Sequence, residues 1–250
     1  GTLMRALAYA AIFGVGLMAA GVATADTWTD PAGRFTVTLP HSWRVQPLSS
    51  TGHTYIKAGD ADHECQIVAT PNTITAASSP AAVRRAGGDD TQFTQESWLR
   101  LANSITPVFP NSSAQFLSRS QDNTGFWPLQ RAELKSTTGV GNPPLPISTV
   151  HAGLTTRPGM DIMGFCYTIS DPDYPTPDNP ALFDPILRSM GTANDATLQA
   201  AAEAADASHA AAEAAAQQQQ SQTQQQQAQH PAEQTQQRHD HREGPSLSHP

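Results

Sequence analysis

The sequence predicts an α+β fold in which an antiparallel β-sheet is covered by two helices. Three observations lead to this fold class. Strand patterns with apolar and polar residues in alternation occur on both sides of one amphipathic helix. Four predicted strands then follow one another without a helical crossover, and a second short helix closes the series. These elements span about residues 26–192 of the 250-residue chain, which is enough to bury roughly 70% of the unfolded surface.

The first strands are predicted from period-two alternation. Phe35, Val37 and Leu39 share one face of a strand that ends at Pro40, and Trp43 and Val45 continue as a second short strand. Residues 52–58 and 65–70 then bracket a turn at 59–64, where Gly and Asp residues favour a hairpin.

A Pro-, Ser- and Ala-rich loop is expected at 71–88, followed by the clearest helix, at 89–105. Asp90 or Thr91 can cap its N-terminus, Glu96 lies in an early turn, and Pro107 follows its end. Its apolar residues recur at helical spacing: Phe93, Trp98, Leu101, Ala102 and Ile105.

The remaining elements predict an antiparallel meander closed by a helix. Strands are expected at 114–121, 129–137, 147–156 and 160–170, joined by turns rich in Gly, Asn and Pro. The helix, at 179–190, contains Pro185 near its first turn, where a missing N–H matters little. Its buried face is formed by Leu182, Phe183, Ile186, Leu187 and Met190.

The N-terminal segment predicts secretion. Arg5 precedes an apolar stretch ending in Ala23-Thr24-Ala25, so residues 1–25 read as a signal peptide cleaved before Asp26; an uncleaved anchor is the alternative. The mature chain is therefore expected in the periplasm or the extracellular space. There Cys65 and Cys166 would form a disulfide that stabilises the fold by about 4–5 kcal/mol, unless both are buried free thiols.

Residues 193–250 predict a low-complexity tail. After Leu198 the only large apolar residue is Leu247, so the segment cannot form a packed core. Its Ala, Glu and Gln residues favour a disordered or transiently helical, solvated tail, and its Gln-rich run could also serve as an interaction segment. Five of the nine His lie in this tail, including His239 and His241, which leaves loose metal chelation as an alternative.

Charge and motifs exclude several functions. The net charge is −8 and no segment is strongly basic, so nucleic acid is a poor partner, as is a membrane surface after signal cleavage. Motifs for serine hydrolases, zinc proteases, phosphate loops and dinucleotide binding are missing. No catalytic, cofactor-binding or metal-binding residue is therefore predicted.

The ionisable residues that remain favour structural roles. Asp60, Asp62, His63 and Glu64 are better explained by a polar hairpin turn than by a metal site, because neighbours along a strand point to opposite faces. His41 follows Pro40, and His151 lies in the middle of a strand, where a hydrogen-bonded sheet residue is expected rather than a catalyst. The loop at 170–180 could bind a cation or a partner, or simply be a rigid connection.

Three stretches together resemble the PsbP-type fold: "GRFTVTLPHSW", "SWLRLA" and "ALFDPILRSM". This family includes the photosystem accessory protein and DcrB-like bacterial envelope proteins. The resemblance covers about residues 26–191 and implies the fold and a non-catalytic, accessory role. It transfers no functional residue to this chain.

The sequence thus predicts a secreted, non-enzymatic accessory or binding protein that has no cofactor and whose partner is an unknown envelope protein. The alternative is a metal-handling protein that uses the His-containing tail or the turn from Asp60 to His63. An unrecognised hydrolase is a third hypothesis.

Overall fold

A computed structural model describes residues 25–48 and 52–242, with side chains through His230. The predicted signal peptide lies outside the described residues except for Ala25. The chain divides into two compact units at Ala202, and each is described by itself.

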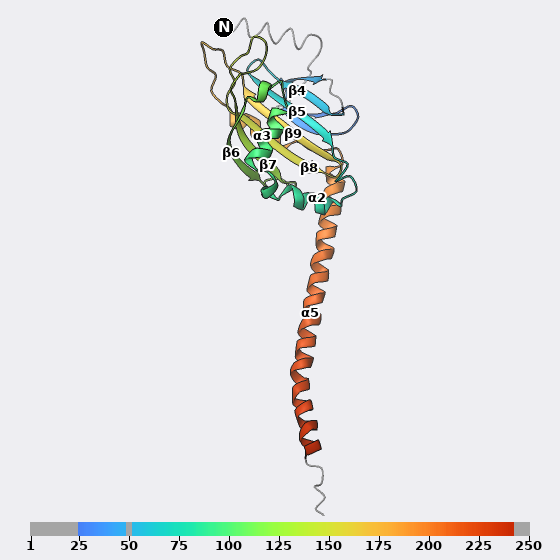
Figure 1. The fold of residues 1–250 in the computed structure, drawn as a ribbon. Coiled ribbons are helices and arrows are strands. Elements are labelled where there is room, and N and C mark those ends of the chain that lie inside the picture. Colours follow the sequence, from blue (N-terminus) through green and yellow to red (C-terminus); the bar gives the residue numbers. More distant parts are fainter. Residues whose placement is uncertain (1–24, 49–51, 243–250) are drawn as a thin grey trace, which may run out of the picture. The chain divides into compact units, whose positions relative to one another are not determined.

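The first unit is built on a seven-stranded antiparallel sheet (Figure 1). The meander predicted from the sequence is confirmed, because β6 to β9 are neighbours in chain order. The N-terminal strands join this meander where β5 pairs with β9. The register of that pair runs from His63 opposite Thr168 to Pro71 opposite Met160. In spatial order the strands are β3 (Arg44–Leu48), β4 (Thr54–Gly59), β5 (His63–Pro71), β9 (Met160–Thr168), β8 (Val150–Arg157), β7 (Leu129–Ser136) and β6 (Ala114–Asp122).

The first alternating strand belongs to a separate two-stranded sheet. β2 (Thr36–Pro40) pairs with β1 (Ala25–Thr29), a strand that the sequence did not predict. Phe35, Val37 and Leu39 are buried on one side, at 0%, 0% and 3% exposure. The predicted alternation is therefore correct, and it directs these side chains against the large sheet.

Two helical predictions need correction. The helix expected at 89–105 is broken into a 3₁₀ turn, η1 (Asp90–Gln92), and α3 (Gln95–Asn103), because Thr94 is extended and its side chain accepts from the Ser97 amide. Within the expected loop at 71–88 lies a further helix, α2 (Pro80–Gly87). Ser79 caps α2 by accepting from the Ala82 amide, and Pro80 occupies its first turn.

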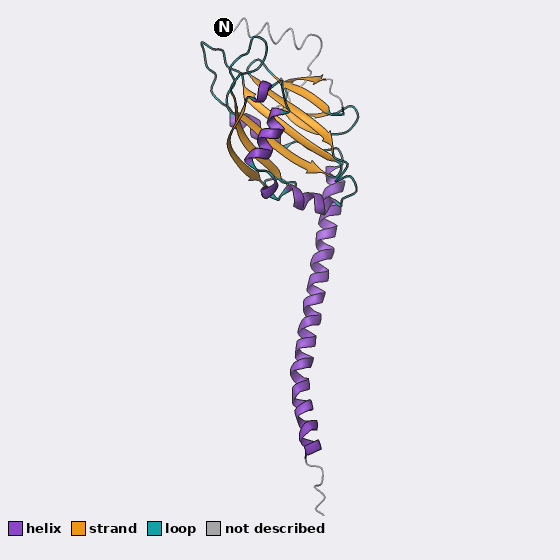
Figure 2. Ribbon diagram, in the orientation of Figure 1, coloured by secondary structure: helices purple, strands orange, loops and turns teal. Residues whose placement is uncertain are grey.

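The large sheet is packed on both faces (Figure 2). One face carries the core that joins β2 and α4 (Pro180–Arg188) to the sheet, which we call the α4 core. The opposite face carries the core that includes α3, which we call the α3 core. The α4 core contains Phe35, Ile56, Cys65, Ile67, Ile162, Cys166, Phe183 and Leu187; the α3 core contains Trp98, Phe109, Leu134, Val150, Phe165 and Tyr167.

Two glycines allow α4 to approach the sheet closely. Gly153 on β8 is paired with Gly164 on β9. A Cβ atom added at Gly164 would lie 2.8 Å from Leu187 Cδ2 and 2.9 Å from Met190 Sδ. The apolar face of α4 was predicted correctly, but Pro185 lies inside the helix rather than in its first turn, where Pro180 stands instead.

Helix α5 (Asp195–Arg242) begins within the first unit. The buried Arg157 side chain binds both carboxylate oxygens of Asp195, at 2.9 and 3.1 Å. It also lies over the ring of Trp127, 4.4 Å from the centroid. Ala202 is fully buried, so the first turns of α5 belong to the packed domain.

The second unit, from Glu203 onward, is a helix whose described side chains are all exposed. Ala and Gln dominate it, so it has no apolar stripe of large side chains. No helix in the described part of the chain is both long and apolar enough to span a membrane.

Candidate functional site

The structure brings ionisable residues from three separate segments together around His151. This residue lies on β8, opposite Glu133 on β7. Its Nδ1 is 2.5 Å from Glu133 Oε2, and its Nε2 is 2.8 Å from Asp178 Oδ2. Asp178 belongs to the loop between β9 and α4. The imidazole is therefore held between two carboxylates, one from the sheet and one from the loop.

A second ion pair extends this cluster. The Arg131 guanidinium lies 2.9 Å from Asp184 of α4 and 3.8 Å from Glu133, and its Nε donates to the Ala152 carbonyl. The side chains of Arg131 and His151 are 9% and 7% exposed, whereas the three carboxylates are each about one-third exposed. The buried groups are thus the cationic ones, and the carboxylates form the solvent-facing rim.

The surroundings of His151 raise its pKa. Burial by itself favours the neutral imidazole and lowers the pKa, but hydrogen bonds and charge interactions with Glu133 and Asp178 outweigh burial. The raised pKa means that the cluster stabilises the imidazolium form. We call Arg131, Glu133, His151, Asp178 and Asp184 the His151 cluster.

The geometry of the cluster suits attachment of the loop to the sheet better than acid–base chemistry. A histidine acts as a general acid or base only when a ring nitrogen can reach a reacting group. Nε2 of His151 hydrogen-bonds Asp178, and Nδ1 lies within ion-pair distance of Glu133 without hydrogen-bond geometry, so both nitrogens face carboxylates. The arrangement can therefore attach a loop to a sheet, and it can respond to protonation.

The turn from Asp60 to His63 is a polar hairpin turn, as the sequence indicated. Asp60 Oδ1 accepts from the backbone amides of Asp62 and His63, at 2.9 and 2.8 Å, and lies 3.0 Å from His63 Nδ1. Glu64 points to the opposite face, where it pairs with Lys57 at 3.1 Å and accepts from the Tyr167 hydroxyl. Among the described residues, no group of three or more His, Cys, Asp or Glu is arranged to hold a metal ion.

The two sheet histidines lie on either side of one aromatic ring. The Phe183 ring centroid is 6.0 Å from that of His63 and 5.7 Å from that of His151. Phe183 belongs to α4 and is fully buried. The helix thus fills the space between the Asp60–His63 turn and the His151 cluster.

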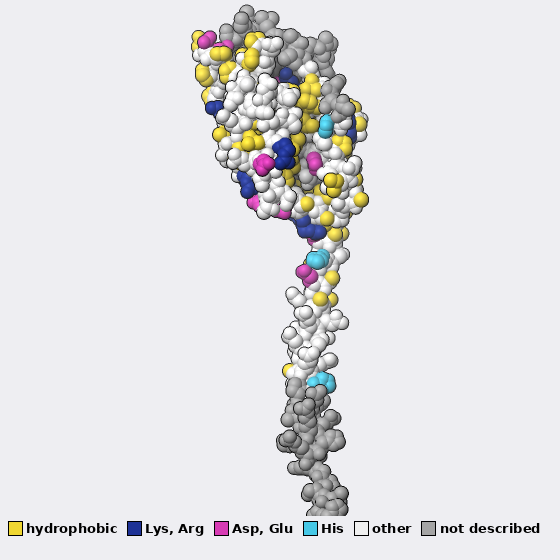
Figure 3. Space-filling view, in the orientation of Figure 1, with side chains coloured by type: hydrophobic (Ala, Val, Ile, Leu, Met, Phe, Trp, Pro, Cys, Tyr) yellow, Lys and Arg dark blue, Asp and Glu magenta, His cyan; other side chains and the backbone are white. Residues whose placement is uncertain are grey.

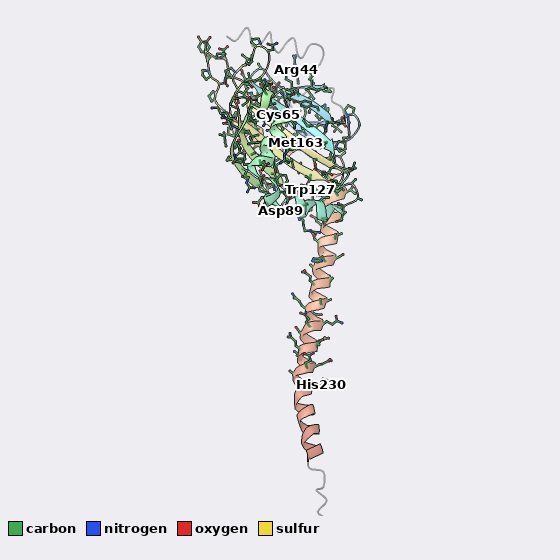
Figure 4. All side chains as sticks on the ribbon, viewed as in Figure 1. Arg44, Cys65, Asp89, Trp127, Met163 and His230 are labelled. Carbon is green, nitrogen blue, oxygen red and sulfur yellow. A yellow bond between two sulfur atoms is a disulfide. The ribbon has the colours of Figure 1, made fainter. Side chains whose placement is uncertain are left out.

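Cys65 and Cys166 form a disulfide between β5 and β9 in the structure. They are register partners with Cα atoms 4.1 Å apart, and both are fully buried. Cys65 is labelled on the sheet in Figure 4. The bond lies in the α4 core, one strand away from His151, which is itself paired with Cys166.

The other predicted candidates do not converge. His41 pairs with Asp26 at 2.8 Å on the surface. In the tail, His209 pairs with Glu213 one helical turn away, while the side chains of His239 and His241 lie outside the described residues. An open pocket of about 180 Å³, lined by Trp28, Trp43 and their neighbours, is smaller than the roughly 300–1,000 Å³ typical of ligand sites.

The sequence indicated two parts of the His151 cluster but not their meeting. His151 and the loop at 170–180 were both singled out, each with a structural interpretation. Glu133, Arg131 and Asp184 were not named at all. No local pattern links these residues, because their proximity depends on the β7–β8 register and on where α4 packs.

Comparison with known proteins adds a modest likeness of fold. No protein-family model matches the chain, and no curated protein matches it either. The solution structure of cyanobacterial PsbP from Synechocystis sp. PCC 6803 is 14% identical with a TM-score of 0.42, covering 72% of this chain and 98% of that one. A crystal structure from Bacteroides thetaiotaomicron VPI-5482 is 11% identical with a TM-score of 0.33, covering 68% of this chain and 49% of that one. The PsbP likeness expected from the sequence is thus found at fold level, and no function is transferred from it.

Proposed function

We propose that this chain is a secreted accessory protein of the periplasm or extracellular space that acts by binding another envelope protein, without catalysing a reaction. The observation that carries the proposal is the buried disulfide between Cys65 and Cys166. Structural disulfides persist in oxidising compartments and are rare in the cytosol. The predicted signal peptide at residues 1–25 supports the same location.

Absence of catalysis is inferred from the use made of the buried histidines. His151 has both ring nitrogens paired, and His63 uses Nδ1 to hold its own turn. A hydrolase needs a nucleophile and a base that face a substrate pocket, whereas these groups face other side chains. Binding of a protein needs no such pocket.

The surface fits a partner other than nucleic acid. On the face shown in Figure 3, Lys and Arg side chains are scattered among Asp and Glu rather than gathered in one patch. The net charge is −8. Phosphate backbones are bound by concentrated basic surfaces, so a protein partner is the better match.

The compartment is tested by expressing the full chain in a bacterial host and labelling thiols in denatured, unreduced fractions. We expect the protein in the periplasm or medium, beginning at Asp26, with neither cysteine labelled. A chain starting at Asp26 without residues 1–25 is the control, and its thiols should be labelled in the cytosol. Finding the full chain in the cytosol with both thiols reactive would contradict secretion.

The mode of action is tested separately. Photo-crosslinking in the native envelope identifies a contact, and binding of that purified protein is then measured by calorimetry. Turnover of ester, amide or phosphoester substrates that is lost in His151→Gln would show an enzyme and overturn the proposal.

A further inference from the structure

The loop from Asp171 to Asn179 connects β9 to α4 and is mostly exposed. It contains three prolines, and Tyr174 at its tip is 74% exposed. Two sets of side-chain contacts attach it to the sheet. Ser170 Oγ accepts from the Thr176 amide at 3.0 Å, and Asp178 pairs with His151 at 2.8 Å.

We propose that the ion pair between His151 and Asp178 is a pH-sensitive latch, which holds this loop and the start of α4 on the sheet while the imidazole is protonated and releases them when it is neutral. The latch is a property of the folded domain and does not depend on the proposed function.

The ion pair also affects the first turn of α4, because Asp178 lies directly before that helix. Asn179 precedes the helix without capping it through its side chain, and Pro180 occupies the first turn. Asp178 accepts from the Asn179 amide at 2.8 Å with the same carboxylate that binds His151. Because the carboxylate that faces this helix end is held by the imidazole, loss of the pair loosens both the loop and the first turn.

The charges around His151 favour release when the proton leaves. Glu133 and Arg131 face it from β7, Asp178 from the loop, and Asp184 from α4 through Arg131. On the β9 side lies the uncharged disulfide, and beyond Phe183 is His63 paired with Asp60. A neutral imidazole leaves three carboxylates facing one guanidinium, and their mutual repulsion pushes Asp178 outward.

The direction of the pH effect follows from the raised pKa of His151. A raised folded-state pKa gives stabilisation that is complete below the ordinary imidazole value of about 6.5 and is lost as pH rises through the folded value. The loop is therefore held at mildly acidic pH and released at alkaline pH.

The test is an NMR titration of the full oxidised chain from about pH 5.5 to about pH 9.5. The ring protons of His151 report its protonation, and amide relaxation at Asp173, Tyr174 and Thr176 reports the mobility of the loop. We expect the released population to rise with pH, with the same midpoint as the His151 titration.

Two variants separate the latch from general effects of pH. Asp178→Asn removes the charge of the partner with little change in shape, so the loop should be mobile at every pH and show no transition. His63→Gln removes the other histidine that packs against Phe183, and the transition should be unchanged. The proposal is overturned if loop mobility stays constant while His151 titrates, or if the transition survives in Asp178→Asn.

Discussion

Gly164 shows how one missing side chain sets the position of a helix. It lies in the α4 core opposite Gly153, and Leu187 and Met190 of α4 occupy the space beside it. Any larger residue would have to displace these side chains or the helix itself. Because Phe183 is on the same helix, such a shift would also move its ring relative to His63 and His151.

We therefore expect Gly164→Ala to lower the free energy of unfolding by about 1–3 kcal/mol, the usual cost of overpacking a core. Urea denaturation monitored by tryptophan fluorescence measures this. Gly125→Ala is the matched control, because an added Cβ there meets nothing within 4 Å. Equal stability of the two variants would show that α4 adjusts without cost.

The disulfide is the second residue-scale feature with a measurable effect. Cys65 and Cys166 are 101 residues apart in sequence, and closing a loop of that length is expected to add about 4–5 kcal/mol on the chain-entropy model. The double variant Cys65→Ala, Cys166→Ala should lose about this much in urea denaturation. Reduced wild-type protein should behave similarly, and a loss below about 1 kcal/mol would contradict the model.

At the scale of elements, helix α3 is defined by its cap. The sequence offered Asp90 and Thr91 as caps, but the chain is extended at Thr94, whose Oγ1 accepts from the Ser97 amide at 3.2 Å. The earlier residues form η1 instead, where Asp89 is the capping side chain. Several polar residues in a row can each cap a helix, and the local sequence alone does not select among them.

Thr94→Ala should therefore destabilise the domain by about 1 kcal/mol, because it leaves the first amides of α3 without their cap. Asp90→Ala removes the cap that the sequence suggested and should change stability by less than about 0.5 kcal/mol. Thermal unfolding followed by circular dichroism compares the two. The reverse order of effects would place the functional cap at Asp90.

Elements whose apolar residues recur at a regular spacing were predicted well, and elements whose limits depend on capping residues were not. The strands of the meander and the buried face of α4 follow from alternation and helical spacing. Helix α2 was missed because it is short and Val83 is its only large apolar residue, although Ser79 followed by Pro80 is a typical helix start. The strand β1 was missed because it spans the predicted cleavage site and none of its side chains is fully buried.

At the scale of the whole molecule, the domain extends into α5. Arg157 is buried, and Asp195 is its carboxylate partner. A boundary after Thr192 was expected from composition, because the sequence becomes low in large apolar residues there. The structure divides at Ala202, since an ion pair and a buried alanine hold the first turns of the helix.

Truncation distinguishes these two boundaries. A chain ending at Ala202 should unfold like the full protein, whereas one ending at Thr192 should lose about 3–5 kcal/mol because Arg157 is left buried without its partner. Guanidinium denaturation of both chains, with Asp195→Asn in the full chain as a third sample, measures the difference. Equal midpoints would show that α5 contributes nothing to the fold.

The His151 cluster belongs to the same scale, because it depends on the whole fold. Alternation along β7 and β8 places Glu133 and His151 on one face, but it does not say that the strands pair in this register. Asp178 and Asp184 reach the cluster only when α4 packs on that face. Long-range register and helix placement were not predictable from local patterns, so the site was visible only in parts.

The pairing of β5 with β9 requires that strand β9 be synthesised before the large sheet can be completed. The hairpin of β4 and β5 is made early in synthesis, but its inner edge stays unpaired until residues 160–168 have emerged. A sheet that depends on contacts this distant in sequence is expected to fold slowly. An apolar strand edge that is still unpaired is prone to aggregate. The Cys65–Cys166 disulfide joins these two strands, so oxidation of both thiols by an oxidant of the surrounding compartment would covalently fix the β5–β9 pairing once it has formed.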